Sequence, residues 1–84
     1  MNIHLPDEQL SVPEIELGAY EHYKGNRYEV IGVGLHSETN EPVVIYRSIN
    51  ASKVPFWVRP YKMFIETVLI GGKKIPRFKK INNE

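Results

Sequence analysis

The chain has 84 residues, a mass of 9.7 kDa and no cysteine. This length is enough for one small domain and too short for two, and the lack of cysteine excludes disulfides and thiolate metal sites. A content of 42% hydrophobic and 25% charged residues is typical of a globular protein that is neither disordered nor membrane-embedded. With no signal-like N-terminal segment either, we predict a cytoplasmic domain with a thin core and no deep pocket.

The net charge of +1 conceals an asymmetry along the chain. Residues 1–42 carry two basic and eight acidic side chains, a net charge of −6, whereas residues 43–84 carry nine basic and two acidic ones, a net charge of +7. The small total gives no reason to expect strong, purely electrostatic binding to nucleic acid or a membrane. If the acidic N-terminal segment folds back on a basic C-terminal strand, that contact would account for the opposite charges of the two halves of the chain.

The chain begins with an acidic arm that Pro6 and Pro13 interrupt. We predict at most one helical turn in this arm, residues 1–17, because each proline disfavours helix in the residue before it. From residue 18 to 81, short aromatic and β-branched runs alternate with turn residues, which predicts an all-β domain followed by a frayed tail at 82–84. The predicted strands are 19–23, 28–36, 43–49, 56–59, 65–70 and 75–79.

Glycines and prolines predict how these strands connect. Gly25-Asn26 and Gly71-Gly72 are typical of tight hairpin turns with positive φ values. Two further glycines, at 32 and 34, predict a bulge or a bend in the second strand, and bent strands favour a small barrel over a flat sheet. Residues 60–64 are too short for an α-helix and begin with proline, which favours a single 3-10 turn.

This layout resembles an SH3-like barrel of five or six short antiparallel strands. An OB-like barrel is the alternative, but that fold usually has a helix between its third and fourth strands and the sequence predicts none there. The last strand is predicted to lie at an edge, because Pro76 cannot donate to a ladder.

Several separate motifs connect the chain to a known family. They are Y-x-H-Y-K-G-N at residues 20–26, H-S-E-T at 36–39, W-V-R-P-x-x-M-F at 57–64 and R-F at 77–78. In this order and spacing they resemble the small bacterial family catalogued as domain of unknown function 1653. The resemblance implies a short, single-domain, mostly β protein and brings no reaction or ligand with it.

Two histidines of the domain, His22 and His36, are candidates for chemistry. Either one paired with Glu38 would form an acid–base pair, which is the basis of one alternative function, a small hydrolase or isomerase using His36 and Glu38. The three side chains also suggest a zinc or nickel site, but a fourth ligand is not evident. We favour loop stabilisation or ligand contact, and predict neither a metal nor a cofactor.

The segment around Trp57 is the most informative of the chain. Alternation in a strand sends Trp57 and Arg59 to one face and Phe56 and Val58 to the other. If Phe56 and Val58 are in the core, then Trp57 and Arg59 form an exposed binding pair. In the alternative, Trp57 fills the core and Arg59 is held by a carboxylate such as Glu38 or Glu66.

These residues support a leading hypothesis of a non-catalytic binding module for a polar or anionic partner, either a small ligand or a protein. We expect no membrane partner, and a monomer or a weak homodimer paired through an edge such as the Pro76 strand. The candidate ligand-binding residues are His22, His36, Glu38, Tyr46, Trp57 and Arg59.

A basic run near the C-terminus suggests a different alternative, an RNA or ribonucleoprotein-associated protein. Basic side chains interleaved with Ile75 and Phe78 are suited to following a phosphate backbone. The same charges also protect a strand edge from aggregation, which is the interpretation we favour. The residues in question are Lys73, Lys74, Arg77, Lys79 and Lys80.

Overall fold

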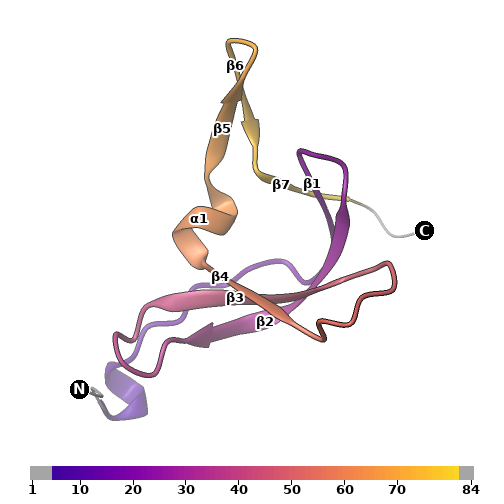
Figure 1. The fold of residues 1–84 in the computed structure, drawn as a ribbon. Helices are drawn as coiled ribbons and strands as arrows, with labels where there is room; N and C mark the ends of the chain where they lie inside the picture. The colour runs from indigo at the N-terminus through magenta and orange to yellow at the C-terminus, as the bar shows by residue number, and fades with distance from the viewer. Residues whose placement is uncertain (1–4, 82–84) are drawn as a thin grey trace.

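The protein is a small, mainly β domain, as the sequence predicts. The structure, a computed structural model, describes residues 5–81 and contains seven strands in two antiparallel sheets with almost no helix (Figure 1). A five-stranded sheet has the order β4-β3-β2-β1-β7, and β5 and β6 form the second sheet. The elements are the 3-10 turn η1 (Asp7–Gln9), β1 (Gly18–His22), β2 (Arg27–Leu35), β3 (Pro42–Ser48), β4 (Trp57–Pro60), α1 (Tyr61–Ile65), β5 (Thr67–Ile70), β6 (Lys73–Pro76) and β7 (Phe78–Lys80). The tail at 82–84 lies outside the described residues.

The long central strand β2 carries the predicted irregularity. Val30 is opposite Tyr46 on β3, but the next register pair is Gly32 with Ile45, so Ile31 is an extra residue. Such a bulge bends the strand and increases its twist.

The five-stranded sheet does not close, so the prediction of a barrel is wrong. β4 and β7 are its two edges, and within residues 5–81 no ladder joins them. The chain leaves the sheet after β4 in α1, a single α-helical turn rather than the predicted 3-10 turn, and then forms the separate β5–β6 hairpin. Phe64 of α1 is 1% exposed and fills the open side of the sheet.

Arg77 splits the predicted last strand into β6 and β7, which gives seven strands instead of five or six. Pro76 has no N–H to continue a ladder. The Arg77 N–H instead donates to the Glu66 carbonyl (3.0 Å), and the Arg77 carbonyl accepts from the Tyr23 N–H (3.0 Å). Arg77 is therefore the point at which the chain passes from the small sheet to the large one.

The core lies on the inner face of the five-stranded sheet, under α1. Phe64 stacks on Phe78 with ring centroids 4.1 Å apart and an interplanar angle of 7°. The N-terminal arm reaches the same core, since Ile15 packs against it and the Tyr20 hydroxyl donates to the Glu16 carbonyl at 2.6 Å. The buried cluster consists of Tyr20, Val30, Val44, Tyr46, Phe64 and Phe78.

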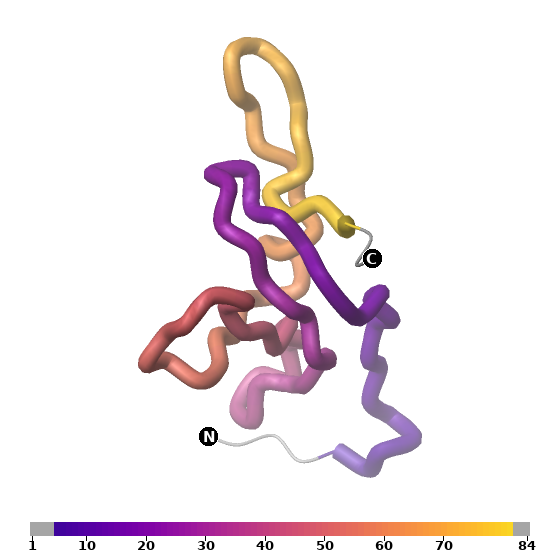
Figure 2. The backbone as a smooth tube through the Cα atoms, turned by 90° about the vertical axis from the view of Figure 1, so that its right-hand side faces the viewer, coloured from indigo at the N-terminus to yellow at the C-terminus, as the bar shows by residue number. Residues whose placement is uncertain are grey.

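Two hairpins rise from the sheet on the same side (Figure 2). In the β5–β6 turn, Gly71 and Gly72 have φ values of 56° and 81°, which confirms the predicted two-residue turn. In the β1–β2 turn, Gly25 has a φ of 108°, but Asn26 has no positive φ, so that part of the prediction is wrong. The His22 N–H closes this longer turn on the Asn26 carbonyl (2.8 Å).

Candidate functional site

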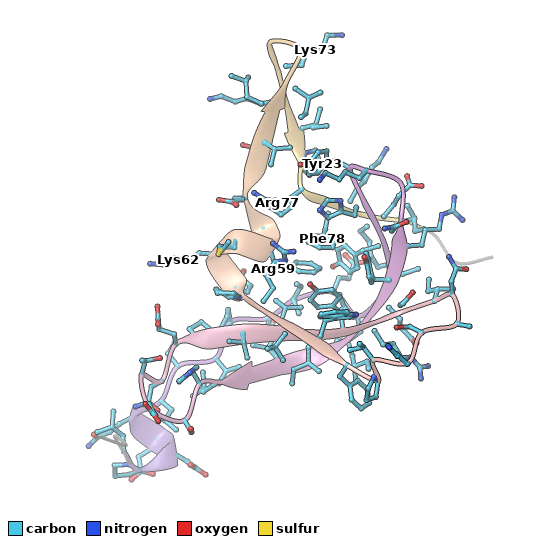
Figure 3. All side chains as sticks on the ribbon, viewed as in Figure 1. Tyr23, Arg59, Lys62, Lys73, Arg77 and Phe78 are labelled. Carbon is cyan, nitrogen blue, oxygen red and sulfur yellow. The ribbon has the colours of Figure 1, made fainter. Side chains whose placement is uncertain are left out.

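Phe78 is the centre of an aromatic and cationic group on the inner face, which we call the Phe78 cluster. His22 meets the Phe78 ring edge-on at 4.9 Å between centroids, and Tyr46 does so at 5.6 Å. The guanidinium carbon of Arg59 lies 5.4 Å from the same centroid (Figure 3). β1, β3, β4 and β7 thus bring three of the predicted site residues, His22, Tyr46 and Arg59, around one ring.

Arg59 is turned inward by its place on β4. It is opposite Val44, a fully buried residue of β3, so its side chain extends over the core. Its Nε donates to the Tyr46 hydroxyl at 3.3 Å, which anchors the guanidinium at one nitrogen. Within residues 5–81, the terminal amino groups of Arg59 have no hydrogen-bond partner and no carboxylate lies within ion-pair distance.

The other three arginines of the chain are all neutralised. Arg27 pairs with Glu21 and Arg47 with Glu29, both on the surface. Arg77 pairs with Glu66, whose Oε1 accepts hydrogen bonds from two nitrogens of Arg77 at 3.1 and 2.7 Å. The prediction that Glu38 or Glu66 holds Arg59 is therefore wrong, because Glu66 pairs with Arg77 and Glu38 has no ion pair with Arg59.

The surroundings of His22 disfavour its protonated form. Burial lowers the pKa of His22 below its usual value, and the nearby charges of Arg59, Arg77 and Lys24 lower it further. Its Nδ1 accepts the Lys24 N–H at 3.1 Å, an interaction that only an unprotonated nitrogen can make. Burial and the neighbouring cations thus act in the same direction on this histidine.

A groove of about 440 Å³ opens beside the cluster, between the β1–β2 turn and the β5–β6 hairpin. His22 forms part of its wall as well as part of the Phe78 cluster. Through His22, the mostly apolar lining of the groove adjoins the Phe78 cluster. Its lining consists of Glu21, His22, Tyr23, Gly25, Ile75, Pro76 and Lys79.

His36 and Glu38 lie elsewhere. They belong to the β2–β3 turn, while His22 is at the β1–β2 turn at the opposite end of the nine-residue β2. At about 3.3 Å per residue, this separates the two histidines by roughly 25 Å. Glu38 reaches His36 through its backbone N–H, which donates to Nδ1 at 3.1 Å, rather than through its carboxylate. The predicted acid–base pair is thus a local turn contact, and no metal site unites the two histidines.

Neither arrangement predicted for the Trp57 segment is found. Trp57 shares the inner face with Arg59 but is 45% exposed, so it is not a core residue. Phe56 and Val58 are 55% and 63% exposed, so the prediction that they are in the core is also wrong. β4 is an edge strand whose main contacts within residues 5–81 are with β3 and α1, and its outer face is left to solvent.

The basic C-terminal run is divided between the two sheets. Lys73 and Lys74 are exposed on β6, beside the projecting turn, whereas Lys79 and Lys80 are on β7. Arg77 is bound to Glu66, and Lys80 lies 3.8 Å from Glu16 of the arm. The arm thus contacts the basic strand at one ion pair.

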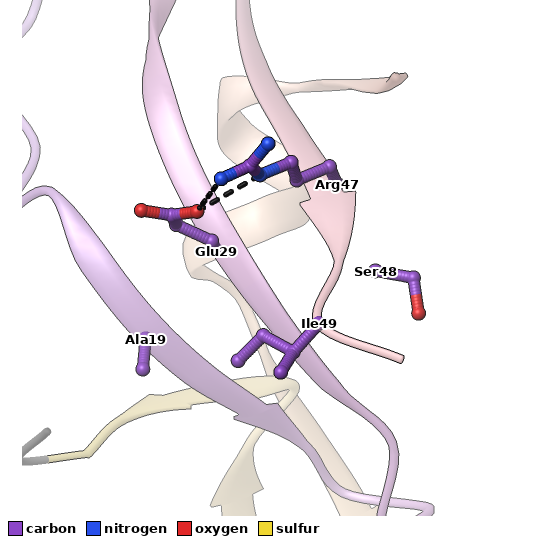
Figure 4. A pocket seen from close by; sticks show the side chains of 5 residues that line it. All are labelled: Ala19, Glu29, Arg47, Ser48 and Ile49. Atoms are coloured by element: carbon purple, nitrogen blue, oxygen red, sulfur yellow. Dashed lines mark hydrogen bonds and ion pairs between the residues drawn. The ribbon is translucent and has the colours of Figure 1, made fainter. Parts of the chain in front are cut away.

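A second surface pocket of about 420 Å³ lies over the opposite face of the sheet. Arg47 crosses it and pairs with Glu29 at 2.7 Å (Figure 4). Because both charges are satisfied, this pocket offers no free group for a charged ligand. Across residues 5–81, no three acidic or histidine side chains gather as metal ligands, and no helix has the length and hydropathy needed to span a membrane.

The sequence did not identify Phe78, Tyr23 or Pro76 as site residues, although they form the floor and walls of this region. The R-F motif at 77–78, which consists of Arg77 and Phe78, was the available signal in the sequence. The motif belongs to the site only because β7 pairs with β1, which places His22 opposite Phe78. These two residues are 56 positions apart in the sequence.

The fold and the cluster define a small, open, mainly β domain with an arginine and a histidine over a buried phenylalanine. The family model for "Protein of unknown function (DUF1653)" matches residues 18–80, so the chain belongs to this family, as its motifs predict. A crystal structure of a family member from Bordetella bronchiseptica is similar, with a TM-score of 0.74 and 33% identity, covering 84% of this chain and 92% of that one.

One longer protein also contains a similar segment. The UDP-N-acetylenolpyruvoylglucosamine reductase of Buchnera aphidicola subsp. Schizaphis graminum (strain Sg) is 38% identical over 58 residues. The match spans 69% of this chain and 17% of the reductase. The similarity therefore concerns a small part of that protein.

Proposed function

We propose that the protein is a non-catalytic binding module that holds an anionic group, a phosphate or a carboxylate, against Arg59. The observation that carries this proposal is the exception among the arginines: three have carboxylate partners, and the half-buried one on the inner face has none among residues 5–81. Removing a charge from water is costly without a partner. A ligand anion would supply the missing partner.

The geometry of Arg59 suits this role. The Tyr46 hydroxyl accepts from its Nε and the Phe78 ring lies beside its guanidinium carbon, which leaves the terminal N–H groups free for a paired contact with two ligand oxygens. Burial is the main cause of the lowered pKa of His22, and the positive charges of Arg59, Arg77 and Lys24 add to it. An anion bound there would raise the pKa of His22 toward its usual value.

The adjoining groove suggests what the anion is attached to. Tyr23, Ile75 and Pro76 offer an apolar wall next to His22. We therefore expect a ligand whose anionic group is joined to an apolar or aromatic part, presented by a small molecule or by a protein side chain. Such a ligand would bind better than either part alone.

The test is an NMR titration with inorganic phosphate, phenyl phosphate and phenol. We expect phenyl phosphate to bind most tightly, to shift the signals of Arg59 and His22, and to raise the pKa of His22. Charge-assisted hydrogen bonds of about 1.5–3 kcal/mol predict that Arg59→Gln weakens binding roughly 10- to 100-fold. Arg47→Gln is the matched control, because Arg47 lies on the opposite face, and it should bind as the unchanged protein does.

Equal binding by the Arg59→Gln and unchanged proteins would refute the proposal. So would shifts distributed over the exposed lysines. The RNA alternative makes a different prediction in a parallel titration, namely salt-dependent binding of single-stranded RNA that is lost when Lys73 and Lys74 are replaced by Gln and retained in Arg59→Gln.

A further inference from the structure

The β4 edge of the five-stranded sheet is unusually apolar. β4 pairs with β3 on one side only, so its other side presents unpaired backbone groups. Three consecutive large side chains are exposed there: Phe56 at 55%, Trp57 at 45% and Val58 at 63%. Soluble proteins usually protect such edges with charged side chains. The one charge on this strand, Arg59, is turned inward to Phe78 and gives no such protection.

The opposite edge of the same sheet is protected. β7 carries Lys79 and Lys80, and antiparallel pairing of β7 with a copy of itself about Lys79 would place the two copies of Lys79 opposite each other. The two edges of the sheet are thus unequal, with lysines on β7 and exposed apolar side chains on β4. Self-association through the large sheet is therefore favoured at β4 alone.

We propose that β4 pairs antiparallel with β4 of a second copy of this chain, about a two-fold axis at Val58. The dimer would have one continuous sheet of ten strands, built on the same surface from both copies. In this register Val58 is opposite Val58 of the partner subunit. Phe56 is opposite the partner's Pro60, and these contacts cover the exposed apolar side chains of the outer face.

The inner face of the same register is also complementary. Trp57 and Arg59 are on one face of β4, since they are opposite Tyr46 and Val44 of β3. Pairing about Val58 places Trp57 of each subunit opposite Arg59 of the partner subunit, so the indole ring can cover the aliphatic part of that arginine while its guanidinium stays over Phe78. No like charges are placed opposite each other in this pairing. The proposal accounts for the exposure of Trp57 and does not depend on the proposed anion site.

The first test is the mass of the protein in solution as a function of concentration. We expect sedimentation equilibrium to show a reversible change from 9.7 kDa to twice that value. Val58→Lys would place two lysines at the axis and should leave a monomer, with no change in the circular dichroism spectrum. Leu69→Lys is the matched control, since Leu69 is 68% exposed on β5, away from β4, and it should dimerise normally.

The second test fixes the register and uses the absence of native cysteine. Val58→Cys should oxidise to a disulfide-linked dimer, because the two Val58 Cα atoms would lie within the range of a disulfide across the axis. Phe56→Cys should not, because its two copies would be separated by four residues of strand, or about 13 Å. A protein that stays monomeric at millimolar concentration, a Val58→Lys dimer, or equal cross-linking of both cysteine variants would overturn the proposal.

Discussion

Phe64 is the side chain through which α1 closes the open side of the sheet, and Phe64→Leu tests that role. Leucine keeps the site apolar but loses the ring that stacks on Phe78 and meets Tyr20 edge-on. Leucine has three fewer side-chain carbon atoms, and at about 25 cal/mol per Å² its smaller buried area costs about 1 kcal/mol. The lost aromatic pairing adds about 0.5–1.5 kcal/mol. We therefore expect Phe64→Leu to lower the free energy of unfolding by about 2 kcal/mol.

Urea unfolding, followed by the fluorescence of the single tryptophan, measures this loss. With a denaturant slope of about 1 kcal/mol/M for a chain of this size, the midpoint should fall by about 2 M. Met63→Leu is the control, because Met63 precedes Phe64 on the same turn but is 43% exposed, and it should stay within about 0.5 kcal/mol. Equal stability of Phe64→Leu and Met63→Leu would show that α1 does not fill the core.

Three further predictions concern the site and the arm. Because the pKa of His22 is lower in the folded protein than in the unfolded chain, the unfolded chain binds more protons below about pH 6.5. Stability should therefore fall as the pH decreases from that value, and His22→Gln should flatten this part of a plot of unfolding free energy against pH. Tyr20→Phe removes the hydrogen bond to the Glu16 carbonyl and should cost about 1 kcal/mol, with faster hydrogen exchange in the arm, whereas unchanged exchange would contradict the anchoring role. Glu66→Gln removes the charge that neutralises Arg77, so phenyl phosphate should bind more tightly, and weaker binding would argue against an anion site.

The sequence determined most of the local structure. Runs of β-branched and aromatic residues predicted the strands within one or two residues for β1 to β4, because side-chain alternation and turn residues act locally. The bulge beside Gly32 and the Gly71-Gly72 turn were also predicted, since glycine favours such backbone geometry. The family motifs are likewise a property of the sequence and identified the family correctly.

The tertiary structure alone decided which of these elements meet. Whether a bent sheet closes depends on the partner available to each edge, and β4 and β7 lack the common pairing that a barrel requires. His22, Arg59 and Phe78 come from three distant strands, so their grouping depends on β7 pairing with β1 and β4 pairing with β3. Alternation placed Trp57 and Arg59 on one face, but the missing second layer over the edge strand determined that Phe56 and Val58 stay exposed. A pattern of residues specifies the two faces of a strand, whereas burial depends on what the rest of the chain places against each face.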